Sequence, residues 1–245
     1  MDINKLNHDC WEITERYRNL DVYGKKVCTP YFINNAEKYF TQLMNTAGIP
    51  SDSVKKVGEL YNNREVPYGW YRGKGTPEQI SQSIEKISEI VGFTLDNLSV
   101  DAIQEYMKIF GVGIDCSGFV YNVLSFAFGK TGLLEKFNNS LAWLNPEKQG
   151  PTRAGVFVFS GEASDEVKIE DLRSLDVILV KNIKGAGGYS HMMMILEGDN
   201  GLNVAQSTLS IVPAGVHIEK LEEWKVSNED RSDLEFRRLK ILDNE

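Results

Sequence analysis

Cysteine and histidine are both scarce in this sequence. The 245 residues include three of each, and no two cysteines form a CxxC pair. Neither a disulfide framework nor a zinc site with four ligands can be assembled from so few residues without distant carboxylates. His8 and Cys10 could offer two ligands, but we interpret them as a chance pair on a polar helix. We therefore expect no metal and no cofactor.

Basic residues and long apolar runs are also lacking. The chain has 27 Lys and Arg against 35 Asp and Glu, which gives a formal net charge of −8 at pH 7. Nucleic acid binding draws on clustered basic side chains, so we expect no nucleic acid partner. No run approaches the roughly 18 apolar residues that cross a bilayer, so we expect no membrane span. The first residues lack the apolar core of a secretory signal, so the protein either stays inside the cell or has lost its signal.

The spacing of apolar residues changes along the chain. It is helical up to about residue 60, which predicts an N-terminal helical segment over residues 1–60. Within a second domain, residues 61–245, an inserted helical region at about 74–110 contains predicted helices near Pro77–Val91 and Ser99–Phe110. From Gly155 onward, short runs rich in β-formers alternate with turn signals: GVFVFS, DVILVKN, HMMMIL, LNVAQSTL, GVHIEKL and EFRRLKIL. Helices followed by strands without crossover helices predict an α+β domain with an antiparallel sheet.

One cysteine has an unusual setting. Cys116 stands between Asp115 and Ser117 in GIDCSGFVYNVL, and an apolar stripe at helical spacing follows it: Phe119, Val120, Val123, Leu124 and Ala127. This pattern predicts a helix that starts at the thiol and buries one face. The unpaired N–H groups and the dipole of a helix N-terminus favour the thiolate, which is the nucleophilic form of cysteine. We therefore interpret Cys116 as a candidate nucleophile, whose own N–H could point at a developing oxyanion.

A nucleophilic thiol needs a base, and His191 is the best placed of the three histidines. It follows the turn-forming KGAGGYS and begins the predicted strand HMMMIL, so its ring should project from the rim of the sheet. The other interpretation is an ordinary histidine at a strand end, with its hydrogen bonds satisfied. His217 shares a strand face with Gly215 and Glu219, and we expect that face to point to solvent. The methionines Met192–Met194 alternate faces, which indicates core packing rather than a metal site.

Together these motifs resemble the NlpC/P60 family of papain-like cysteine peptidases. The likeness lies in GIDCSGFV, LDVILVKN, YSHMMMILEGDNGLNVAQST, FRRLKIL and, upstream, VPYGW. It covers residues 66–242 in pieces and is most specific at the cysteine. The resemblance implies a papain-like fold, in which N-terminal helices, with the nucleophile at a helix start, pack on an antiparallel β-sheet. It also implies hydrolysis of peptidoglycan stem peptides beside a γ-linked D-glutamate. If a signal has been removed, we expect the protein to be secreted or associated with the cell wall; otherwise we expect it in the cytoplasm.

The resemblance further implies that Cys116 attacks a peptide carbonyl and that His191 is the base. It also implies a third polar residue, on the next strand, that orients His191. Gln206 shares a strand face with Leu202 and Val204, so we expect it to point inward and to hold the Nδ1–H of His191. Asn203, on the other face of the strand, is the alternative.

Five substrate-binding candidates follow from the same likeness. Tyr68 and Trp70 of VPYGW would line the substrate pocket, although aromatic packing in a Gly-rich turn is the alternative. Asp115 and Ser117 could receive a free substrate amine, or Asp115 could instead cap the helix. Ser190 precedes the base where the family usually has glycine.

Departures from the family pattern leave other functions open. Met193 replaces a small residue, SLD replaces Pro-Gly-Asp, and the stretch between residues 70 and 113 is long enough to add a lid or a pocket wall. The thiol could serve an amidase, or an acyltransferase that passes the acyl group to an amine instead of water. A binding module that kept the fold without turnover is the third possibility.

Overall fold

The computed structural model describes residues 1–32, 48–63, 73–92, 94–182, 188–211, 214–229 and 231–243. Their contacts group the chain into two compact units. Residues 1–14, 116–206 and 217–245 form the first, here called the sheet unit, and residues 15–115 and 207–216 form the second, the hairpin unit. This division differs from the predicted one at residue 60, because the first turns of the N-terminal helix pack with the sheet unit.

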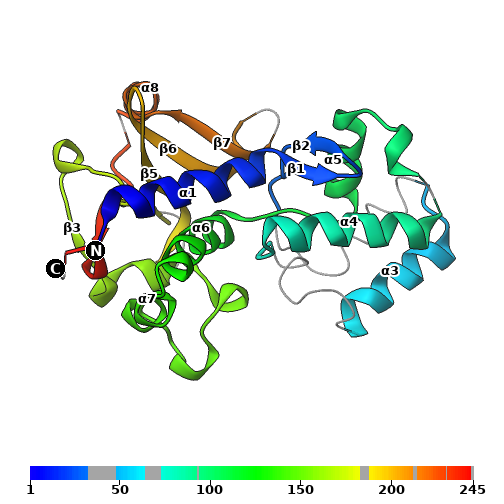
Figure 1. Ribbon diagram of the computed structural model, residues 1–245, viewed down its shortest axis with the longest axis horizontal. Helices are drawn as coiled ribbons and strands as arrows, with labels where there is room; N and C mark the ends of the chain where they lie inside the picture. The colour runs from blue at the N-terminus through cyan, green and yellow to red at the C-terminus, as the bar shows by residue number, and fades with distance from the viewer. Residues whose placement is uncertain are drawn as a thin grey trace. The chain divides into compact units, whose positions relative to one another are not determined.

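The sheet unit is built on a six-stranded sheet with the order β3-β8-β4-β5-β6-β7 (Figure 1). Neighbouring strands from β3 through β6 pair antiparallel. The predicted α+β class with an antiparallel sheet is therefore confirmed. The strands are β3 (Ser164–Glu166), β4 (Val177–Lys181), β5 (Tyr189–Gly198), β6 (Gly201–Thr208), β7 (Gly215–Lys220) and β8 (Leu234–Leu239).

Helix α6 (Cys116–Lys130) packs against β5 and against α7 (Leu134–Ser140). Its residues from Cys116 through Leu124 are all buried. The predicted apolar stripe is buried as expected, and the other side of the first turns is buried as well, so this part of α6 is a core helix. The first helix, α1 (Ile3–Arg18), contacts α6 through its first turns: Lys130 forms an ion pair with Asp9, at 2.8 Å from Nζ to Oδ1.

One face of the sheet forms a core with α8 (Leu221–Asn228), a helix that we did not predict. Side chains alternate between the faces of a strand, so His191 and Gln206 share this face with Met193 and Val204. Met192, Met193 and Met194 are all buried, which confirms the predicted core packing of this run. The core comprises Leu172, Ile178, Val180, Met193, Ile195, Val204, Leu221 and Trp224.

Within its described residues, the hairpin unit combines three helices with a two-stranded hairpin. Helices α3 (Ser51–Asn63) and α4 (Pro77–Val91) pack together, α4 also packs on β1 (Leu20–Val22), and α5 (Val100–Ile109) packs on β2 (Lys25–Val27). The two predicted helices of the 74–110 region are confirmed. The hairpin lies in the segment that we expected to be helical, so that part of the prediction is wrong.

The hairpin and the 3₁₀ helices show where local sequence patterns misled. The turn between β1 and β2 has φ of 48° at Tyr23 and 75° at Gly24, the geometry of a tight hairpin turn. GVFVFS was expected to be a strand, but Val156–Phe159 form a 3₁₀ helix. The other 3₁₀ helices among the described residues are η2 (Leu95–Asn97), η3 (Pro146–Lys148), η4 (Pro151–Arg153), η6 (Gly161–Ala163), η7 (Ile169–Asp171) and η8 (Lys240–Leu242). None of the helices in the described ranges has the length and apolar content that crossing a membrane requires.

Candidate active site

Cys116 is the first residue of α6, as predicted, and it is 6% exposed. Because α6 packs against β5, the helix that begins with the thiol and the strand that carries His191 are neighbours in the sheet unit. A helix start offers N–H groups and a positive dipole end to an anion. This setting suits a thiolate nucleophile.

The other two cysteines have settings that disfavour reactivity. All three are free thiols. Cys10 is fully buried, and burial together with the charge of Asp9 raises the pKa of its thiol. Burial also raises the pKa of Cys28, although its hydrogen bond to the carbonyl of Val216 acts in the opposite direction. A thiol with a raised pKa carries little thiolate at neutral pH, so neither residue is a good nucleophile.

The segment that leads into the nucleophile is fixed by backbone bonds within the hairpin unit. Ile114 donates to Pro30 at 3.0 Å and accepts from Phe32 at 3.1 Å, while the Asp115 N–H donates to Gly73 at 2.9 Å. Gly113 is required here, because a Cβ atom at this position would lie 2.4 Å from the carbonyl oxygen of Pro30. These bonds hold the two residues before Cys116 in an extended conformation.

The carboxylate of Asp115 is engaged by an ammonium group from the same chain. The Nζ of Lys74 lies 2.6 Å from both Oδ1 and Oδ2, and the two side chains are only 9% and 18% exposed. We did not predict this ion pair, whose two residues are 41 positions apart in the chain. The predicted capture of a substrate amine by Asp115 would have to compete with Lys74. It stays a prediction, as does the capping role.

The two predicted substrate-binding serines have their hydroxyls directed at backbone carbonyls. Ser117 is buried, and its Oγ donates to the carbonyl of Ala154 at 3.0 Å, which ties the first turn of α6 to the η4 segment. Ser190 is exposed and donates to Val180 at 3.4 Å. Their contacts with a substrate stay predictions. Tyr68 and Trp70 lie outside the described residues.

His191 and Gln206 are brought into direct contact by neighbouring strands. The Nε2 of His191 lies 2.9 Å from the Oε1 of Gln206, whose side chain points inward as predicted. The predicted contact between the two residues is therefore confirmed, but it involves Nε2 and not Nδ1, because the ring rotamer is not encoded in strand alternation. The alternative partner, Asn203, donates instead to the carbonyl of Gly201 at 3.0 Å.

Glu219 extends this contact to a third strand. The Nε2 of Gln206 donates to the Oε1 of Glu219 at 3.1 Å. An ionised carboxylate only accepts hydrogen bonds, so the amide nitrogen faces Glu219 and the amide oxygen faces the ring. His191 must then carry its proton on Nε2, which leaves Nδ1 as the basic nitrogen of the neutral ring.

Glu219 was not predicted as a site residue, because residues 215, 217 and 219 were expected to face solvent. Glu219 reaches the face that carries Gln206, and His217 is half-buried on β7 two residues before it. Alternation along β7 puts His217 on the same face, so the face that we expected to point to solvent is only partly exposed. The local sequence carries no signal for this residue, because its contact with Gln206 depends on strand order and register.

No protein-family model matches this chain, and no curated protein sequence matches it. The resemblance to the NlpC/P60 family therefore rests on the motif residues alone.

The start of β5 is held in place by a second set of contacts. The pairing of β4 with β5 shifts register between Val180 and Lys181, next to His191. Such bulges redirect side chains and recur near active sites. The Tyr189 hydroxyl donates to Glu235 at 2.9 Å, and burial, followed by this carboxylate, raises the pKa of the phenol. A neutral phenol that remains a donor anchors the strand two residues before the candidate base.

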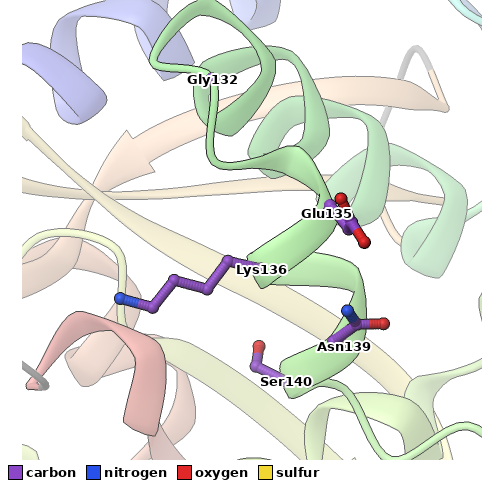
Figure 2. Close-up of a pocket in the computed structure, with 5 residues that line it drawn as sticks. All are labelled: Gly132, Glu135, Lys136, Asn139 and Ser140. Carbon is purple, nitrogen blue, oxygen red and sulfur yellow. The ribbon is translucent and has the colours of Figure 1, made fainter.

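No group of three or more His, Cys, Asp or Glu side chains within the described residues is arranged to hold a metal ion. A surface hollow of about 550 Å³ lies on α7 (Figure 2). Figure 2 shows Lys136 extending away from Glu135 and Asn139, and the Ser140 hydroxyl donates to Phe137 at 2.7 Å. None of the predicted site residues lines this hollow, and its charged side chains do not converge on a common point.

Proposed function

We propose that this protein is a papain-like cysteine hydrolase that cleaves an amide bond through a thioester. The observation that carries the proposal is the hydrogen-bonded chain from His191 through Gln206 to Glu219, because it leaves Nδ1 of the ring as a base. Cys116, at the start of the helix that packs on the same strand, is the nucleophile. A base oriented by a further polar group is the arrangement that activates a cysteine for acyl transfer.

In the proposed reaction, Nδ1 of His191 takes the proton of the Cys116 thiol, and the thiolate attacks the carbonyl carbon. The backbone N–H of Cys116 faces the oxyanion of the tetrahedral intermediate. His191 then gives its proton to the departing amine, and the C–N bond breaks to leave a thioester on Cys116. Water, deprotonated by His191, attacks the thioester and releases the acid and the free thiol.

The substrate class comes from the resemblance, which points to peptidoglycan stem peptides cut beside γ-linked D-glutamate. The test is incubation of the protein with muropeptides of different stem length, with products read by mass spectrometry. Cleavage that is lost in Cys116→Ala supports the proposal. Intact peptides together with an unlabelled Cys116 after iodoacetamide treatment would contradict it. A product in which an added amine replaces water would instead indicate an acyltransferase.

A further inference from the structure

The contact between Gln206 and His191 is ambiguous when taken alone. A glutamine amide presents an acceptor at one end and a donor at the other, and the two ends have nearly the same shape. With the oxygen toward the ring, His191 carries its proton on Nε2. With the nitrogen toward the ring, Nε2 must accept, and the proton moves to Nδ1. The orientation of this amide therefore decides which ring nitrogen is basic.

We propose that Glu219 is a positioning residue that fixes the Gln206 amide and, through it, the tautomer of His191. The inference rests on the proposed function only where it treats His191 as the base. Glu219 lies 3.1 Å from the amide nitrogen. If the amide were reversed, its oxygen would face a carboxylate oxygen, so two acceptors would meet without a proton between them.

The burial of Gln206 opposes the reversed orientation of its amide. Gln206 is 6% exposed, and its two hydrogen bonds connect three successive strands of the sheet, β5, β6 and β7. A buried amide cannot readily exchange a lost protein partner for water, so each end keeps the partner that satisfies it. Glu219 thus sets the orientation of the Gln206 amide, and the amide in turn sets the tautomer of the His191 ring, although Glu219 bonds to Gln206 and not to the ring.

The direct test reads the tautomer by ¹⁵N NMR of protein labelled at histidine. His191→Ala identifies the His191 signals among the three histidines. In the wild-type protein, above the pH at which the ring titrates, Nε2 should have the shift of a protonated nitrogen and Nδ1 that of an unprotonated one. Glu219→Gln should move both shifts toward each other, because a second amide accepts either orientation of Gln206. Unchanged shifts in Glu219→Gln would overturn the inference.

A reciprocal exchange provides the rescue. In Gln206→Glu combined with Glu219→Gln, the carboxylate at position 206 can only accept, from the ring and from the new amide. Glu219→Gln alone should lower kcat on the order of tenfold and leave KM unchanged. In the double variant, the Nε2–H tautomer should return and kcat should recover. Glu223→Gln is the matched control, because this side chain is 68% exposed on α8. It should leave the spectrum and the rate unchanged.

The two proposals fail in different ways. If Glu219→Gln shifts the tautomer while the wild-type protein cleaves no peptide, the positioning role stands and the proposed hydrolase does not. The second case is a wild-type protein that cleaves peptides. If the double variant Gln206→Glu with Glu219→Gln then keeps the mixture of tautomers seen in Glu219→Gln, Glu219 does not position the base. If the double variant has the wild-type Nε2–H tautomer but no activity, the link between the tautomer of His191 and turnover would also be refuted.

Discussion

At the scale of single residues, His191 is the one side chain in the proposed reaction that must both accept and return a proton. Replacing it with alanine removes the base but little packing, since the ring lies near the start of β5. We expect His191→Ala to lower kcat/KM by roughly 10²- to 10⁴-fold, the usual contribution of general acid–base catalysis. Peptide cleavage followed by mass spectrometry measures this loss.

His217→Ala is the matched control for that variant. It removes the same ring from a strand of the same sheet and should leave cleavage unchanged. If His217→Ala abolishes cleavage while His191→Ala does not, the base has been assigned to the wrong strand. Iodoacetamide labelling gives a check that needs no substrate, because Cys116 should react more slowly in His191→Ala.

The ion pair between Lys74 and Asp115 predicts a large effect on stability. Both side chains are mostly buried, so Lys74→Met leaves a carboxylate without its cation. Breaking a buried pair from one side costs about 3 kcal/mol or more, which urea denaturation would measure. Removing both charges in Lys74→Met with Asp115→Leu should recover part of this loss. Lys26→Met is the control, because its pair with Asp21 is exposed on the same unit.

A small effect of Lys74→Met would have a different meaning. If stability falls no further than in Lys26→Met, the pair is easily opened, and a substrate amine could displace Lys74 from Asp115. In that case wild-type protein should cleave peptides with a free N-terminus faster than acetylated ones. Equal rates on both peptides, together with the expected loss of stability, would assign Asp115 a structural role.

The residues of the proposed reaction could be predicted from the sequence, whereas the residues that contact them could not. Cys116 and His191 have local signals, a helix start and a strand start, and Gln206 followed from alternation along β6. Lys74 and Glu219 act through partners on other elements, 41 and 13 residues away along the chain. Such contacts depend on strand order and register, which no local pattern contains.

At the scale of elements, the extended segment before α6 requires glycine for close backbone packing. Gly113→Ala would place a Cβ atom 2.4 Å from a carbonyl oxygen, so the backbone must shift. We expect a loss of about 1–3 kcal/mol, measured by thermal unfolding. Gly58→Ala is the control in α3, where a Cβ meets nothing within 4 Å. There alanine should stabilise by up to about 1 kcal/mol through helix propensity. Equal effects would mean that the packing at Gly113 is loose.

Elements with strong end signals were the ones that could be predicted. Helix α4 begins with a capping box formed by Thr76 and Gln79, and α5 begins with a cap from Ser99. The β1-β2 hairpin carries only a short Tyr-Gly turn, and each strand is three residues long. The run at Val156–Phe159 is rich in β-formers, yet it forms a helical turn outside the sheet. Short apolar runs do not distinguish these outcomes.

At the scale of the whole molecule, the three thiols should separate by reactivity. Burial raises the pKa of Cys10 and of Cys28, so their thiolate fractions at neutral pH are small. Iodoacetamide at neutral pH should therefore label Cys116 first, and labelling of the other two should increase as the pH rises. Peptide mapping of the alkylated protein measures the order. Labelling of Cys28 before Cys116 would remove the basis for an activated nucleophile.

The position of β8 in the sheet has a consequence for biogenesis. This strand lies between β3 and β4, although it follows all the other strands in the chain. While the ribosome is still making residues 234–239, β4 has an open edge and β3 has no neighbour in the sheet. The nascent protein must therefore keep an unpaired strand edge from joining another chain until synthesis reaches β8.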